Sequence, residues 1–140
     1  MMQRSTQNRG FQEIPHAADW AMKVWAEDLP GLFAEAAAGM NTLAGARLST
    51  GPRIKRIFEG EASDAESLLV AFLSELVYLQ EQENIGFADF DIRLDGLQLS
   101  AKMEGAELAA LEKPIKAVTF HDIKILKVAG RYEVQVVFDV

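Results

Sequence analysis

The sequence predicts an α+β domain in which two helices pack on a mainly antiparallel sheet, in the order β-α-β-α-β-β-β-β. Two stretches carry apolar residues at helical spacing, several others alternate apolar and polar residues, and the second half contains two glycine turns. The length of 140 residues suits one domain, and 49% apolar residues can form its core. We expect residues 1–9 to be a loose, flexible polar arm and residues 10–140 to be a single domain.

The first strand and helix are predicted by local pattern. Residues 20–26 alternate in the manner of a short strand. Asp28 is a candidate N-cap, and Pro30 stands in the first turn, where proline is tolerated. Apolar residues then recur every three or four positions up to Leu43, which predicts a helix over residues 29–43.

A second helix is predicted over residues 64–83, after a weaker strand pattern at residues 53–61. Ser63 and Glu66 have the spacing of a capping box directly before an apolar run. Asn84 fits the end of this helix.

Two hairpins are predicted in the second half. Asp95-Gly96 is a two-residue turn between alternating segments, and it pairs Leu94 with Leu97. The second hairpin joins residues 117–128 to residues 131–139 around Ala129-Gly130. Its two-residue loop would place Asp139 opposite Phe120, with Lys116 just past the chain end and within reach of it.

Composition excludes several classes of site. The absence of cysteine excludes disulfides, thiolate metal sites and a cysteine nucleophile, and two histidines exclude a zinc site of three histidines. A net charge of −7 argues against general nucleic-acid binding. We expect no membrane association and a cytoplasmic location, because neither a signal sequence nor an apolar span is visible.

Two acidic positions are candidate metal ligands. Asp139 stands beside the α-carboxylate of Val140, and such close like charges repel unless a cation lies between them. Ca²⁺ or Mg²⁺ would suit these oxygens, and the alternative is a solvated chain end. His16 and Asp19 lie three apart before the first strand; the alternative is a turn histidine and a capping aspartate.

The remaining candidates have ordinary alternatives. His121 shares a predicted face with Ile123 and Ile125, so it reads as either a core histidine or an acid–base group. Lys116 precedes a strand, where a lysine is usually solvated. The basic cluster formed by Arg53, Lys55 and Arg56 would meet phosphate or an acidic partner, or would simply be a solvated strand face.

Taken together, several segments resemble the archease family in the right order from about residue 10 to the end. They are Gly10-Phe11, His16–Asp19, Leu32-Phe33, Ala36-Ala37, Gly39-Met40, Leu68–Leu79, Ile115–His121 and Val136–Val140.

The resemblance implies an accessory protein, not an enzyme. Archeases assist the RNA-splicing ligase, which uses GTP, by promoting its guanylylation and repeated turnover in tRNA splicing or RNA repair. The partner would be that ligase, with GTP and RNA contacted at most through it. The resemblance also implies a divalent cation, commonly Ca²⁺, held by Asp19, Asp139 and Val140, and it gives His16, Lys116 and His121 a part in activating the ligase.

The sequence departs from the family pattern at three places. Ala17 replaces a usual threonine, Ala46 stands where many members carry a metal-binding aspartate, and residues 105–114 are shortened. Losing a carboxylate weakens a site for a hard cation. Two other functions stay open, a metal-dependent phosphoester hydrolase and an RNA or protein chaperone.

Overall fold

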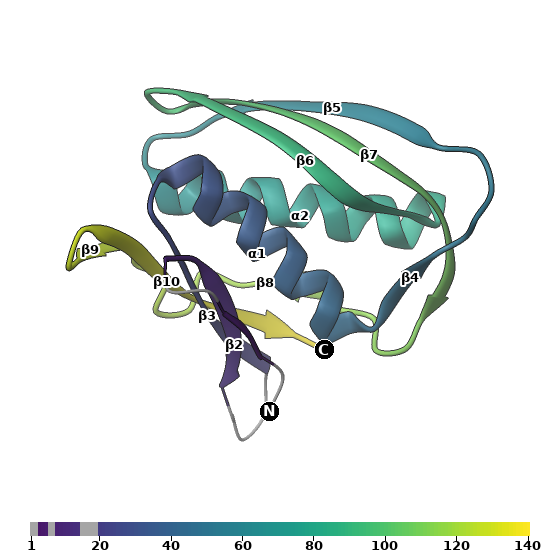
Figure 1. Cartoon of the computed structure of the whole chain (residues 1–140), viewed down its shortest axis with the longest axis horizontal. Coiled ribbons are helices and arrows are strands. Elements are labelled where there is room, and N and C mark those ends of the chain that lie inside the picture. Colours follow the sequence, from purple (N-terminus) through teal and green to yellow (C-terminus); the bar gives the residue numbers. More distant parts are fainter. Residues whose placement is uncertain (1–2, 6–7, 15–19) are drawn as a thin grey trace.

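A computed structural model describes residues 3–5, 8–14 and 20–140. In this part of the chain, helices α1 (Leu29–Ala44) and α2 (Ala65–Glu83) lie in a layer between two antiparallel sheets (Figure 1). The predicted class, a single α+β domain, is confirmed. The helices are covered by a sheet on each side, whereas the sequence predicted only one sheet.

The sheet that carries the chain end is called the terminal sheet. Its strands are β1 (Gln3–Ser5), β2 (Gly10–Ile14), β3 (Trp20–Ala26), β10 (Arg131–Asp139), β8 (Ala117–Val118) and β9 (Leu126–Val128). Strand β3 has the predicted bounds. Strand β1 pairs with β2, so Gln3–Ser5 belong to a sheet and not to a loose arm.

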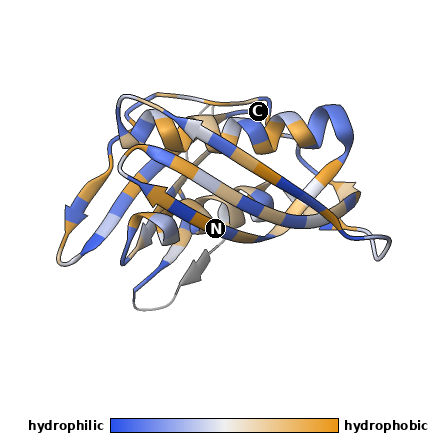
Figure 2. Ribbon diagram, turned by 90° about the horizontal axis from the view of Figure 1, so that it is seen from above, coloured by the Kyte–Doolittle hydropathy of each residue, from blue (hydrophilic) through white to orange (hydrophobic). Residues whose placement is uncertain are grey.

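The opposite sheet is called the long-strand sheet. It comprises β4 (Ala46–Leu48), β5 (Ile54–Glu61), β6 (Ile85–Asp95) and β7 (Gln98–Leu111). Viewed from above, its strands change between hydrophilic and hydrophobic residues along their length (Figure 2). One face therefore packs on the helices, and the other face is left to solvent.

Helix α1 is capped as predicted. The Asp28 carboxylate accepts a hydrogen bond of 2.7 Å from the Gly31 N–H, which satisfies a backbone donor that the first turn leaves free. The helix ends at Gly45, whose φ of 65° lies in the left-handed region that favours glycine.

Helix α2 begins one residue later than the capping-box pattern implied. The side chain of Asp64, and not that of Ser63, accepts the hydrogen bond from the Ser67 N–H, at 2.7 Å. A carboxylate is a stronger acceptor than a hydroxyl and carries a charge that suits a helix N-terminus. Asn84 ends the helix at φ 56°, as predicted.

Phe72 of α2 lies at the centre of the core. Its ring is fully buried and packs against Phe33 of α1, Phe58 of β5 and Phe90 of β6, with ring centroids 6.1–6.2 Å apart. This aromatic cluster joins both helices to the inner face of the long-strand sheet.

The first predicted hairpin exists with a different turn. The loop is Gly96-Leu97, Leu94 lies opposite Leu99, and the predicted pairing of Leu94 with Leu97 is wrong. Gly96, at φ 59°, takes the first turn position, where a positive φ requires glycine. Because the partner of Leu94 moves by two residues, the side chains within both strands keep their predicted faces, and Leu99 is buried. Leu97 instead lies in the turn and is exposed.

The second predicted hairpin is interrupted. Val128 pairs with Arg131 as predicted, but residues 119–125 leave the sheet, and Asp122 adopts a φ of 53°. The chain rejoins β10 at Ala117, which lies opposite Asp139, so the predicted pairing of Asp139 with Phe120 is wrong. The interruption brings Lys116 closer to the chain end than the uninterrupted hairpin would.

Candidate functional site at the chain terminus

The backbone ties Lys116 to the last strand. The Lys116 N–H donates a hydrogen bond of 2.8 Å to the carbonyl oxygen of Asp139, next to the pair Asp139–Ala117. Thr119 strengthens this junction, since its N–H and its hydroxyl both donate to the Val137 carbonyl oxygen at 3.0 Å. Residues from two distant parts of the chain are therefore fixed together at the end of β10.

The side chains at this junction are exposed, and no described residue pairs with their charges. Lys116, Asp139 and Val140 are all solvent-exposed. Neither the Lys116 ammonium nor the Asp139 carboxylate forms an ion pair with any residue that the structure describes. We call Lys116, Asp139 and Val140 the terminal site. Its charges are available to a partner or a ligand.

The terminal site supplies part of a donor set for a hard cation. The Asp139 carboxylate and the α-carboxylate of Val140 are oxygen donors, the kind that Ca²⁺ prefers. Over residues 3–5, 8–14 and 20–140, no three acidic or histidine side chains gather closely enough to hold an ion. Asp19 and His16 lie outside the described residues, so their part in the site stays a prediction. Ala46, at the start of β4, offers no side-chain oxygen.

His121 is not a core histidine. Its side chain is 62% exposed, and Nε2 lies 3.2 Å from a carboxylate oxygen of Asp122. The prediction that His121 lies in the core was wrong. It assumed that the strand continues through residues 119–125, and these residues leave the sheet. The segment is held instead by α2, where the Glu66 carboxylate accepts a hydrogen bond from the Ile125 N–H at 3.0 Å.

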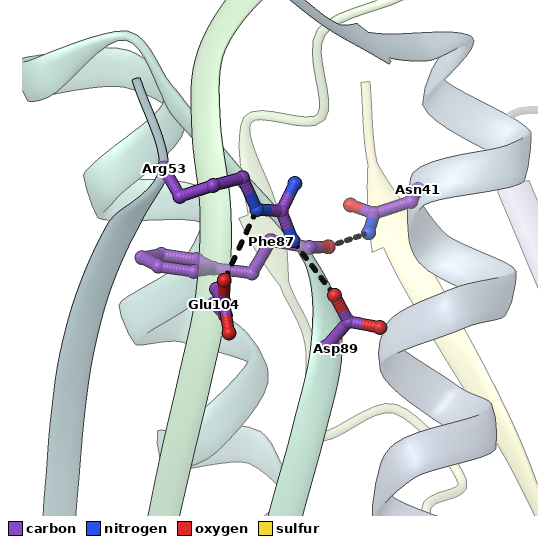
Figure 3. Close-up of polar contacts among 5 residues, drawn as sticks. All are labelled: Asn41, Arg53, Phe87, Asp89 and Glu104. Atoms are coloured by element: carbon purple, nitrogen blue, oxygen red, sulfur yellow. Dashed lines mark hydrogen bonds and ion pairs between the residues drawn. The ribbon is translucent and has the colours of Figure 1, made fainter. Parts of the chain in front are cut away.

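Two of the three residues of the basic cluster, Arg53 and Arg56, pair with neighbouring carboxylates, whereas Lys55 is exposed and forms no ion pair with a described residue. Arg53 lies between Glu104 and Asp89, with N–O distances of 3.2 and 2.7 Å (Figure 3). Arg56 pairs with Glu83 at 2.9 Å. Exposed pairs of this kind reduce the positive potential that a phosphate group would meet.

Sequence reasoning missed a polar network between the helices. Gln80 of α2 is buried, and its Nε2 donates to Asn41 of α1. Asn41 in turn donates to the carbonyl oxygen of Phe87 at 2.7 Å (Figure 3). Gln80 falls on the apolar face of α2, and a polar residue on such a face is the signal that was available.

A second missed feature ties the amino-terminal region to α1. Glu35 is buried on α1, and its carboxylate pairs with the Arg9 guanidinium at 2.7 Å. Arg9 belongs to the segment that was expected to be loose.

The comparisons with known proteins assign the chain to a family. The model of the archease protein family matches residues 11–140. This chain belongs to the archease family. An archease from Methanosarcina barkeri is 34% identical over 97% of this chain and 99% of its own length. Archeases from Thermococcus gammatolerans and Thermococcus kodakarensis are 33% and 31% identical, each over 94% of this chain and 99% of their own lengths.

Solved structures agree on the archease fold. The solution structure of a Methanobacterium thermoautotrophicum protein gives a TM-score of 0.70 with 25% identity, over 93% of this chain and 98% of that one. The crystal structure of an archease from Thermotoga maritima gives a TM-score of 0.69 with 22% identity, over 92% and 96%. Within its described residues, the chain contains no helix that is long and apolar enough to cross a membrane.

Proposed function

We propose that this archease activates the GTP-dependent RNA-splicing ligase, promoting its guanylylation and repeated turnover in tRNA splicing or RNA repair. The chain acts as an accessory protein and catalyses no reaction itself. Membership of the archease family over nearly the full length of the chain supports this role.

The hydrogen bond between the Lys116 N–H and the Asp139 carbonyl oxygen carries the proposal. It fixes the backbone of an exposed lysine beside the end of β10, so the ammonium group extends into solvent from this point. An ammonium group at this place lowers the energy of phosphate oxygens near it, because it compensates their negative charge. In this mechanism the terminal site contacts the ligase where triphosphate is bound, and Lys116 meets the phosphate oxygens.

A divalent cation belongs to the same proposal, and Ca²⁺ is favoured. Asp139 and the Val140 carboxylate fit a hard ion by donor chemistry, with Asp19 as the further carboxylate. When bound, such an ion supplies positive charge that orients phosphate oxygens. The backbone bond between Lys116 and Asp139 holds the terminal site together without the ion and keeps Lys116 beside these oxygens.

The test is a ligation assay with excess RNA substrate over the ligase of the same organism. Wild-type protein should raise the number of turnovers, and Lys116→Ala should remove this stimulation. The matched control is Lys55→Ala, which removes an exposed lysine from the long-strand sheet. Absence of stimulation by the wild type would overturn the function, and full stimulation by Lys116→Ala would overturn the role of the lysine.

The two other functions have less support. The chaperone hypothesis rested partly on the basic cluster, and Arg53 and Arg56 are engaged in ion pairs. A hydrolase would need a base beside the metal ligands. His121, the described histidine, sits in an exposed turn beside Asp122. Phosphoester turnover that requires Asp139 would nevertheless favour the hydrolase.

A further inference from the structure

A hollow of about 360 Å³ opens beside Lys116, between the second half of α2 and the segment that joins β7 to β8. Its apolar walls are formed by Val77, Leu111, Pro114 and Ile115. We call it the α2 hollow. Its size accommodates one large side chain of another molecule, and its walls favour an apolar one.

Gln80 gives the α2 hollow a fixed polar group. Its side chain is among the hollow's lining, yet only 7% of the residue is exposed. The bond of 3.1 Å from Gln80 Nε2 to Asn41 Oδ1 locks the amide, and Asn41 is itself locked by the Phe87 carbonyl oxygen. The Gln80 carboxamide oxygen accepts no hydrogen bond from any described residue, and it is not among the buried atoms that lack a partner, so solvent reaches it. This oxygen can accept a hydrogen bond at the edge of the hollow from an occupant whose apolar side chain fills the hollow.

Two opposite charges complete the lining. Glu81 and Lys116 both border the α2 hollow, and within residues 3–5, 8–14 and 20–140 neither is part of an ion pair. Lys116 lines the α2 hollow, and its backbone N–H also bonds to Asp139 in the terminal site. The hollow and the terminal site are therefore one continuous surface.

This combination selects a protein segment as the occupant. The Glu81 carboxylate repels phosphates, and the net charge of −7 disfavours a nucleic acid. Apolar walls with a polar rim have the anatomy of a protein interface, in which a side chain fills a pocket and charges pair at the edge. A basic side chain next to the inserted one complements Glu81.

We propose that the ligase inserts one apolar side chain into the α2 hollow and pairs a neighbouring basic side chain with Glu81, anchoring the complex while Lys116 faces the nucleotide. This inference rests on the proposed function, because the ligase is the partner.

The first experiment measures affinity for the purified ligase. Glu81→Arg should weaken binding by about tenfold and make the remaining affinity less sensitive to salt, because it reverses the charge at the rim. Glu59→Arg makes the same change of charge at an exposed position of β5, on the other side of the helices, and should leave the affinity unchanged. Equal affinities of the two variants would overturn the proposed pairing.

The second experiment uses the lack of cysteine in the chain to place a single fluorescent bimane label. Pro114→Cys carries the label on an exposed wall of the hollow, and Glu59→Cys carries it at the control position. On addition of ligase, the label at position 114 should become protected from iodide quenching or should itself prevent binding. The label at position 59 should do neither.

The outcomes separate the two proposals. If labelled Pro114→Cys binds ligase and stays as accessible to iodide as in the free protein, the hollow is empty in the complex, and this inference is overturned while the proposed function stands. If the wild type neither binds nor stimulates the ligase, both proposals are overturned.

Discussion

Exposed charged side chains are paired differently in two regions of this archease. On the outer face of the long-strand sheet, Arg53 is shared between Asp89 and Glu104. At the terminal site, Lys116 and Asp139 are joined through their backbones, yet their side chains form no ion pair with any residue the structure describes. Arg53 is thus compensated within its own sheet, whereas no described residue compensates the charges of Lys116 and Asp139.

The difference follows from strand geometry. On the outer face of a sheet, side chains on neighbouring strands stand about 5 Å apart, so opposite charges meet across the ladder. At the end of a strand, backbone pairing fixes the residues, but the side chains extend past the last neighbour. Charged residues at a strand end are therefore better placed for binding than an equally charged sheet face.

The largest expected effect concerns the core beneath the long-strand sheet. Phe72→Ala should lower the free energy of unfolding by about 3–5 kcal/mol, because it leaves a cavity among Phe33, Phe58 and Phe90. This loss of stability can be measured by urea denaturation, with unfolding monitored by circular dichroism. Phe72→Leu, which keeps much of the volume, should cost less. Equal losses for the two variants would mean that the cavity does not determine the effect.

The second prediction compares the two regions in function. Lys116→Ala should reduce stimulation of the ligase by about 30-fold, the equivalent of about 2 kcal/mol for a central contact of an interface. Arg53→Ala removes a cation of the sheet face and should leave stimulation within about twofold of the wild type, because Arg53 contacts its own sheet. Steady-state ligation rates at several activator concentrations measure both. Similar defects in the two variants would remove the functional distinction between the regions.

The third prediction concerns the metal. Asp139→Asn should lower the affinity for Ca²⁺ by about tenfold or more, because a hard cation loses an anionic oxygen. Isothermal titration calorimetry with CaCl₂ measures it. Asp95→Asn, at the exposed hairpin end of the long-strand sheet, is the matched control and should bind like the wild type. Unchanged affinity in Asp139→Asn would exclude that carboxylate as a ligand.

A smaller effect is expected from the ion pairs themselves. Arg53→Ala should change the free energy of unfolding by less than about 1 kcal/mol, because exposed pairs gain little in water. The change should shrink further in 1 M NaCl, where salt screens exposed charges. A larger loss in urea denaturation would show that the sheet face contributes to stability.

The smallest effect concerns the α2 cap. The hydrogen bond from the Ser67 backbone N–H lowers the pKa of Asp64 below its usual range. A lowered pKa stabilises the fold above the unfolded-state value and loses this contribution as the pH falls through the folded-state value. Asp64→Ala should therefore lower the melting temperature slightly at pH 7, and the difference should vanish in strong acid. Asp64→Asn, which retains a capping oxygen, should melt closer to the wild type at pH 7.

Local signals in the sequence determined much of the fold. Asp28 and Gly45 bound α1, Asn84 ends α2, and alternation gives β3 its limits, because caps and periodicity depend on neighbours within a few residues. The faces of the first hairpin were also predictable. Its register slips by two, so the side-chain period of two is preserved even though the turn was misplaced.

Only the tertiary structure decided how distant segments meet. Alternation cannot reveal that residues 119–125 leave the sheet, since that depends on Glu66 of α2 and on Asp122 at positive φ. The second sheet over the helices and the α2 hollow likewise arise from packing between elements far apart in the chain. The sequence predicted Lys116 near Asp139, and the fold supplied the bond that fixes them, because backbone pairing depends on the register of β8 with β10.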